Sequence, residues 1–237
     1  MLVPLNTCRQ EITDVNIDIS NVNKYYTTKD NFGNHKFYGE IIQSHNSFSV
    51  LVSGVATTGL EIYEEYTQDP SFFSLLKYQT AITYPLSTIS SYHKSLNLQQ
   101  FNSNYEKAIH IMRAVYTHFK YVTGSTQIHA TAEEALKLGE GVCQDYAHIM
   151  LSLLRIEGIP CRYVVGIMQG EGASHAWTEV LCNGYWYGFD PTNNKLVDDE
   201  YIKISCGRDS GDCAVIRGIF RGVAEQIQTE LVVVEEL

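Results

Sequence analysis

The stretch from Gly139 to Pro160 constrains the fold more than any other part of this chain, because a glycine-flanked loop runs directly into a continuous helix pattern. The loop leads to Cys143, and apolar residues then recur at helical spacing. They are Val142, Tyr146, Ile149, Met150, Leu153 and Leu154. A stripe this broad predicts a helix buried in the core, and Gly158 and Pro160 predict where it ends.

Strand patterns follow this helix. Residues 161–168, 174–181 and 185–189 are rich in β-branched and aromatic residues, and short glycine-containing turns separate them. The tail contains two further apolar runs, at residues 214–220 and 229–234, which predict two more strands.

The first third of the chain also reads as strands. Residues 11–19, 36–42 and 48–55 have alternating or apolar patterns, with one slip of phase in the first, and a turn-rich segment occupies residues 30–34. A small antiparallel sheet is the simplest interpretation.

The middle of the chain contains three helix starts. Asp69 before Pro70 predicts one, since Asp is a good N-cap and Pro fits the first helical position. Ser103 with Glu106 and Thr131 with Glu134 have the spacing of capping boxes, and Gly139 predicts the end of the last helix. Strand-rich ends around a helical centre predict an α+β protein, with a β-rich N-terminal region over residues 1–60 and a core over residues 61–237.

The charge of the chain argues against several classes of partner. Its 17 Lys and Arg against 27 Asp and Glu give a formal net charge of −10, and no segment concentrates basic residues. Such a chain repels nucleic acid and anionic membranes. We find no signal peptide pattern and no apolar run of the roughly 20 residues that span a bilayer, so we expect a cytoplasmic protein with no membrane partner. The sequence makes no prediction of the oligomeric state.

The six cysteines predict free thiols rather than a metal site or a disulfide framework. None of them forms a CxxC pair, and the spacing of Cys182, Cys206 and Cys213 fits no usual zinc pattern. No glycine-rich phosphate loop is present either. We therefore expect no cofactor.

Cys143, His175 and Asp190 are the candidate catalytic residues. A cysteine is a nucleophile only as its thiolate, which a helix N-terminus and a neighbouring imidazolium both favour. Cys143 lies where the loop enters the helix, His175 lies on a predicted strand, and Asp190 ends the next strand. The histidine can move the thiol proton, and the aspartate can fix the imidazole tautomer.

Four sequence blocks resemble the transglutaminase-like superfamily, in particular its bacterial branch described as cysteine proteases. They are Gly-Val-Cys143-Gln-Asp-Tyr-Ala-His, Gly-Ile-Pro160-Cys-Arg-Tyr-Val, Ser-His175-Ala-Trp and Trp-Tyr-Gly-Phe-Asp190-Pro-Thr-Asn. The resemblance extends to the turn at residues 30–34 and to a C-terminal block at residues 207–222, where Ser210 stands in place of a more usual aromatic residue.

This resemblance implies a papain-like core, in which the helix with the cysteine packs on an antiparallel sheet or half-barrel that carries the histidine and aspartate. It implies attack of Cys143 on an amide carbonyl of a peptide or protein substrate, with the Cys143 backbone N–H as one oxyanion donor. We expect Gly141, Gln144 and Trp177 to line the substrate site.

Alternative interpretations remain at this point. The same triad would serve a protein-glutamine transamidase, and a catalytically idle peptide-binding module would use the same groove. A lone cysteine on an apolar helix is more often a core residue, but the flanking glycines and the two partner motifs favour catalysis. We expect Asp145 to stabilise the helix N-terminus and His148 to be non-catalytic.

Overall fold

A central antiparallel sheet organises the computed structural model, which describes residues 1–22, 24–65, 74–219, 221–222, 225 and 227–237. Its strand order is β13-β12-β11-β9-β14, and β6 pairs with the start of β12 on the same edge as β13. The strands are β6 (Glu64–Glu65), β9 (Cys161–Met168), β11 (His175–Cys182), β12 (Tyr185–Asp190), β13 (Lys195–Leu196) and β14 (Tyr201–Gly207). All of their pairings are antiparallel.

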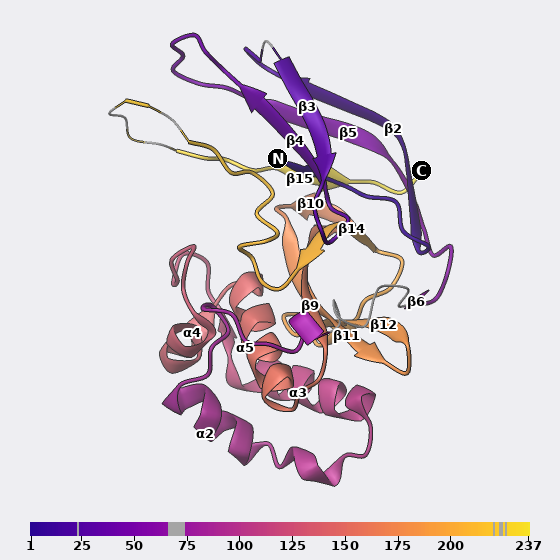
Figure 1. The fold of residues 1–237 in the computed structure, drawn as a ribbon, viewed down its shortest axis with the longest axis vertical. Coiled ribbons are helices and arrows are strands. Elements are labelled where there is room, and N and C mark those ends of the chain that lie inside the picture. Colours follow the sequence, from indigo (N-terminus) through magenta and orange to yellow (C-terminus); the bar gives the residue numbers. More distant parts are fainter. Residues whose placement is uncertain (23, 66–73, 220, 223–224, 226) are drawn as a thin grey trace.

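Helix α5 (Cys143–Ile156) packs against β11 and β9 and fills the core (Figure 1). Every residue from Asp145 to Arg155 is buried, so this helix is covered on all sides rather than along one stripe. Helices α2 (Ser87–Ser95), α3 (Asn104–His118) and α4 (Ala132–Leu138) pack against it and provide that cover, and the short η1 (Leu98–Gln100) lies between α2 and α3 in the chain.

The two predicted capping boxes begin α3 and α4, as expected. In each box the N-cap side chain, Ser103 or Thr131, accepts from the backbone N–H of the glutamate three residues later, and that glutamate bonds back to the N-cap backbone. Gly139 ends α4 with a φ of 81°, a left-handed conformation that favours glycine. A short parallel pair, β7 (Lys120–Tyr121) and β8 (Glu140–Gly141), then leads the chain to Cys143.

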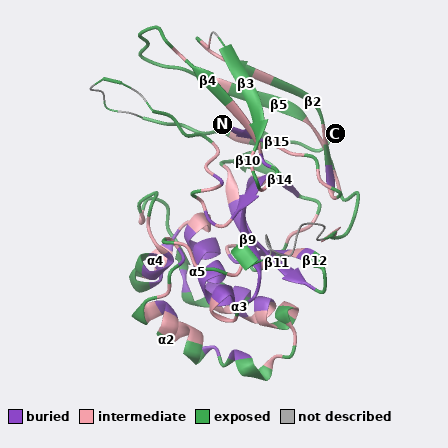
Figure 2. Ribbon diagram, in the orientation of Figure 1, coloured by how far each residue is buried: buried purple, intermediate pink, exposed green. Residues whose placement is uncertain are grey.

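The N-terminal β-region lies beside the central sheet, and most of its surface is exposed (Figures 1 and 2). It consists of a β1-β4-β3 sheet and a β2-β5 pair. The strands are β1 (Leu2–Val3), β2 (Gln10–Ile19), β3 (Lys24–Lys29), β4 (His35–Glu40) and β5 (Val50–Thr58). The phase slip seen in the sequence is a register shift between Thr13 and Asn16, where Asp14 has a φ of 51°.

Two side chains fasten this region to β14. Gln10 accepts from the backbone N–H of Lys203 at 2.8 Å and donates to its carbonyl oxygen at 2.8 Å. Asn34, from the predicted turn, makes the same pair of bonds with Cys206, at 2.8 and 2.7 Å. A predicted domain boundary at residue 60 stays a prediction, but these contacts tie both sides of it together.

The structure departs from the predictions in the C-terminal tail. The predicted strand at residues 214–220 is wrong for its described part: no strand is formed at residues 214–219, where Ile219 is 98% exposed. The last predicted strand is shorter than expected, since β15 (Val232–Val234) alone pairs, with β10 (Gly170–Gly172). The predicted helix start at Asp69 and Pro70 lies outside the described residues. None of the helices in the described ranges is both long and apolar enough to cross a bilayer.

Candidate active site

Cys143 is the first residue of α5, directly after the N-cap Val142. Its backbone N–H belongs to the first turn, where amide groups have no partner within the helix. Asp145 braces this turn: its Oδ2 accepts from the Val142 backbone N–H at 2.8 Å and from the Thr126 hydroxyl at 2.7 Å. Asp145 is 1% exposed, and burial raises its pKa, although both bonds oppose that rise. The expected role of Asp145 at the helix start is thus matched by its contacts.

His175 and Asp190 form a direct hydrogen bond between adjacent strands. His175 begins β11 and Asp190 ends β12, and the distance from His175 Nε2 to Asp190 Oδ2 is 2.8 Å. The aspartate is fully buried, whereas Cys143 and His175 are partly exposed. A buried carboxylate thus lies behind an imidazole that solvent can reach.

The pKa of His175 is the most informative electrostatic feature of the site. Burial lowers this pKa, but hydrogen bonds with Asp190 and Cys143 and the charges of both groups outweigh burial and raise it to about 9. Because Nε2 binds Asp190, the remaining ring nitrogen, Nδ1, is the one left for the Cys143 thiol. At neutral pH the ring therefore carries a positive charge beside the sulfur.

Asp190 is held as an anion by several donors. Its Oδ1 accepts from the backbone N–H groups of Thr192 and Asn193 at 2.9 and 3.2 Å. Its Oδ2 accepts from Asn193 Nδ2 at 2.7 Å and from the Tyr201 hydroxyl at 2.8 Å, besides His175. Burial raises the pKa of Asp190, but the bond and charge of His175, and then the other two side-chain bonds, bring it below its ordinary value.

The three residues expected to line the substrate site differ in exposure. Gln144 is partly exposed and donates from Nε2 to the Ile128 carbonyl at 3.0 Å, which holds the loop before α4. Gly141 is buried, and a Cβ at this position would overlap the Asp145 side chain, so glycine is needed here for packing. Trp177 is only 1% exposed. This burial contradicts direct substrate contact by Trp177, whose ring instead stacks beside His175 at a centroid distance of 6.4 Å.

Sequence reasoning missed two residues of the site. For Asn193 the sequence offers a local signal: it directly follows the Asp-Pro-Thr segment, and a short polar side chain after the end of a strand often bonds back to that strand. Tyr201 gave no local signal, since β14 carries it to Asp190 from a different part of the sheet.

No cluster of three or more His, Cys, Asp and Glu side chains with the geometry of a metal site occurs in the described parts of the chain. All six cysteines are free thiols. His148, expected to be non-catalytic, is fully buried and accepts the Ser210 backbone N–H at 3.2 Å, and burial lowers its pKa to about 4.

Comparison with known families agrees with this geometry. Residues 95–191, which include Cys143, His175 and Asp190, match the family model of the transglutaminase-like superfamily. This part of the chain is therefore similar to the core of the transglutaminase-like superfamily. The match supports a cysteine-dependent enzyme.

Several mycobacterial relatives resemble the chain. An uncharacterized protein of Mycobacterium leprae is 40% identical over 112 residues, which cover 43% of this chain and 40% of that protein. An uncharacterized protein of Mycobacterium tuberculosis H37Rv is 28% identical over 253 aligned positions, covering 92% of this chain and 79% of that protein. The aligned region thus spans less than half the length of the M. leprae relative.

Solved structures share the fold. A "Putative Cysteine Protease" from Cytophaga hutchinsonii superposes with a TM-score of 0.68 at 24% identity, covering 90% of this chain and 76% of that one. The periplasmic domain of TgpA from Pseudomonas aeruginosa has a TM-score of 0.51 at 18% identity, covering 81% and 67%. The predicted α+β fold, with the cysteine helix packed on an antiparallel sheet, is confirmed.

Proposed function

We propose that this chain is a cysteine hydrolase that cleaves peptide or isopeptide amide bonds through a thioester. Cys143 is the nucleophile, His175 the base and acid, and Asp190 the residue that orients His175. The observation that carries this proposal is the 2.8 Å bond between His175 and Asp190, on a histidine whose pKa the neighbouring Cys143 side chain helps to raise. A cysteine that served only to pack the core would not be expected to lie beside such a histidine–aspartate pair.

The resting site is poised for acylation. Because the pKa of His175 is raised to about 9, the ring is an imidazolium at neutral pH, and its charge favours the Cys143 thiolate. The sulfur attacks the amide carbonyl carbon, and the C=O electron pair moves to oxygen, where the Cys143 backbone N–H stabilises it. As the tetrahedral intermediate collapses, the C–N bond breaks and His175 gives its proton to the leaving amine.

Deacylation reverses the proton flow. The neutral imidazole now takes a proton from water while the water oxygen bonds to the thioester carbon. Collapse breaks the C–S bond, releases the carboxylic acid, and leaves the thiolate beside a restored imidazolium. One water is consumed for each bond cleaved. Asp190 keeps its negative charge throughout and stabilises each imidazolium that forms.

The first test uses p-nitrophenyl acetate as an acyl donor. We expect a burst of p-nitrophenol and one acetyl group on Cys143, found by peptide mass spectrometry. The burst should vanish in Cys143→Ala and persist in Cys8→Ala, a matched change at an exposed cysteine. Acetyl groups spread over several cysteines, or an unchanged burst in Cys143→Ala, would exclude Cys143 as the nucleophile.

A second assay separates hydrolysis from transamidation. Casein is incubated with the protein and a fluorescent primary amine, and both new peptide termini and bound amine are measured. Hydrolysis predicts new termini without bound amine. Bound amine without new termini would replace the hydrolase by a transamidase that uses the same thioester.

A further inference from the structure

Tyr201 lies directly behind the His175–Asp190 pair, outside the part of the chain that matches the family model. It begins β14, its side chain is 4% exposed, and its hydroxyl donates to Asp190 Oδ2 at 2.8 Å. The bond runs to the same oxygen that binds His175. Any change at this hydroxyl therefore acts on the atom that holds the histidine.

The ring of Tyr201 has little freedom to move. It packs edge-on against Trp177 at a centroid distance of 5.4 Å, and the Lys195 ammonium lies 5.7 Å from its centroid. Trp177 in turn is close to Gly166, where a Cβ would overlap the indole. Burial and the neighbouring Asp190 charge raise the pKa of Tyr201 far above its ordinary value. The hydroxyl therefore remains a donor across the physiological range.

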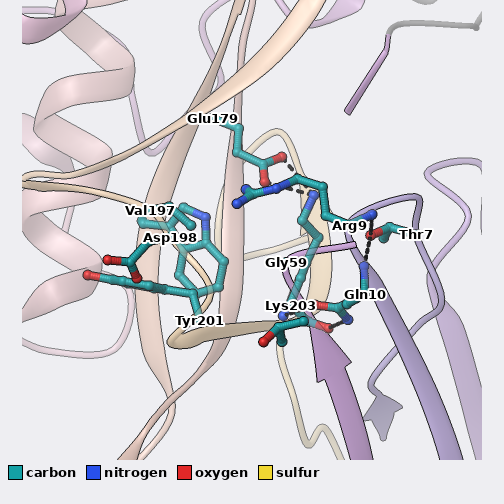
Figure 3. Close-up of a pocket in the computed structure, with 11 residues that line it drawn as sticks. Thr7, Arg9, Gln10, Gly59, Glu179, Val197, Asp198, Tyr201 and Lys203 are labelled. Carbon is teal, nitrogen blue, oxygen red and sulfur yellow. Dashed lines mark hydrogen bonds and ion pairs between the residues drawn. The ribbon is translucent and has the colours of Figure 1, made fainter. Parts of the chain in front are cut away.

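The N-terminal region fixes the strand that carries Tyr201. Figure 3 shows Gln10 facing the backbone of Lys203, two residues along β14 from Tyr201, and both of its backbone bonds are 2.8 Å. Gln10 is itself 3% exposed and donates also to the Leu5 carbonyl at 2.7 Å. The position of Tyr201 is thus set by contacts on both sides of β14.

We propose that Tyr201 is a positioning residue, whose hydroxyl fixes Asp190 and shares its negative charge, so that the imidazole of His175 is held at the correct angle and basicity toward Cys143. This inference rests on the proposed function. Oδ2 divides its charge among three donors. Removing one leaves more charge for His175 and one fewer restraint on the carboxylate.

Tyr201→Phe tests the proposal while keeping the ring. We expect the NMR titration of His175 to move to higher pH, because Asp190 is then shared by fewer donors. We expect kcat for p-nitrophenyl acetate to fall about tenfold with an unchanged KM, as for other buried residues that orient a reacting group. Incorporation of 3-fluorotyrosine at position 201 makes the hydroxyl a stronger donor and should move the titration the opposite way without disturbing packing.

Tyr146→Phe is the matched control. Tyr146 is 3% exposed, and its hydroxyl also makes one 2.8 Å bond, but to the Phe119 carbonyl. A similar loss of melting temperature is expected from both variants, whereas only Tyr201→Phe should move the His175 titration.

His175→Ala separates failure of this inference from failure of the proposed function. If His175→Ala abolishes acylation while both changes at Tyr201 leave kcat and the His175 titration as in the wild type, the positioning role is wrong and the hydrolase stands. If His175→Ala leaves acylation intact, both are wrong.

Discussion

Replacing Asp190 by Asn removes the anion that keeps His175 protonated but preserves the size of the buried side chain. In the folded protein the pKa of His175 is about 9, against 6.5 for an ordinary histidine. Burial is already the largest single influence on this pKa, and without the carboxylate only Cys143 opposes it, so the pKa falls. The amide of the new side chain would also donate to Nε2, which forces the ring proton onto Nδ1, the nitrogen that must accept from the thiol.

The stability that His175 contributes follows from this difference. A raised folded-state pKa stabilises the protein fully below pH 6.5, and the contribution is lost as pH rises from 6.5 to about 9. At 1.36 kcal/mol for each pH unit, the whole shift corresponds to about 3 kcal/mol, and about 2 kcal/mol of it is lost by about pH 8. The His175 side chain is only 13% exposed, so screening by solvent reduces this little.

Urea unfolding of wild type and Asp190→Asn at pH 6.5 and about pH 8 measures the effect. The wild type should lose about 2 kcal/mol more than the variant over this range. The N-terminal amine, whose pKa burial lowers, also titrates here, but it does so in both proteins and cancels. Above about pH 8 thiols of the unfolded chain begin to ionise, so the range ends there. Equal losses in the two proteins would refute a proton held on His175 by Asp190.

Three further substitutions test other parts of the account. His148→Gln should make the protein less sensitive to acid. Because burial lowers the pKa of His148 to about 4, the wild type loses about 3 kcal/mol of unfolding free energy as pH falls from 6.5 towards 4. Urea unfolding of both proteins at these two pH values measures the difference. Glu179→Gln should lower the free energy of unfolding by about 3–5 kcal/mol at neutral pH, because the buried carboxylate bonds Arg162 and Lys203 at 2.6 and 2.7 Å. The matched change at an exposed glutamate, Glu200→Gln, should lower it by less than about 1 kcal/mol, and equal losses in the two variants would contradict this prediction. Asp145→Ala should lower the free energy of unfolding by about 1–2 kcal/mol and slow the alkylation of Cys143, because the Val142 backbone N–H at the start of the helix loses its acceptor. If the variant is destabilised but Cys143 is alkylated at the wild-type rate, Asp145 contributes to stability and not to the reactivity of Cys143.

The parts of the fold that the sequence predicted well depend on local signals. Ser103 with Glu106, and Thr131 with Glu134, satisfy the amides of their own helix turn, so their meaning does not depend on the rest of the chain. The apolar stripe after Cys143 likewise requires only that some core exists. The site residues Cys143, His175 and Asp190 were predicted because each lies at the end of such an element.

The parts that were missed depend on distant partners. Strand β14 is buried throughout, yet Lys203 and Ser205 interrupt its apolar pattern. Its lysine is tolerated only because Glu64 and Glu179 neutralise it, at 2.7 Å each. Conversely, residues 214–219 have a strand-like composition but form no strand, although the backbone N–H of Leu2 in β1 donates to the Val215 carbonyl at 2.8 Å. Tyr201 reaches Asp190 through sheet pairing, which no local pattern encodes.

The pH dependence of iodoacetamide labelling at each cysteine, read by peptide mass spectrometry for the wild type and His175→Ala, tests the central claim most directly. A thiolate held by an imidazolium predicts that Cys143 labels faster than the exposed Cys8 and loses this advantage in His175→Ala. If Cys143 labels no faster than Cys8 and ignores the substitution, it is not the nucleophile, and a peptide-binding role without catalysis is the better account.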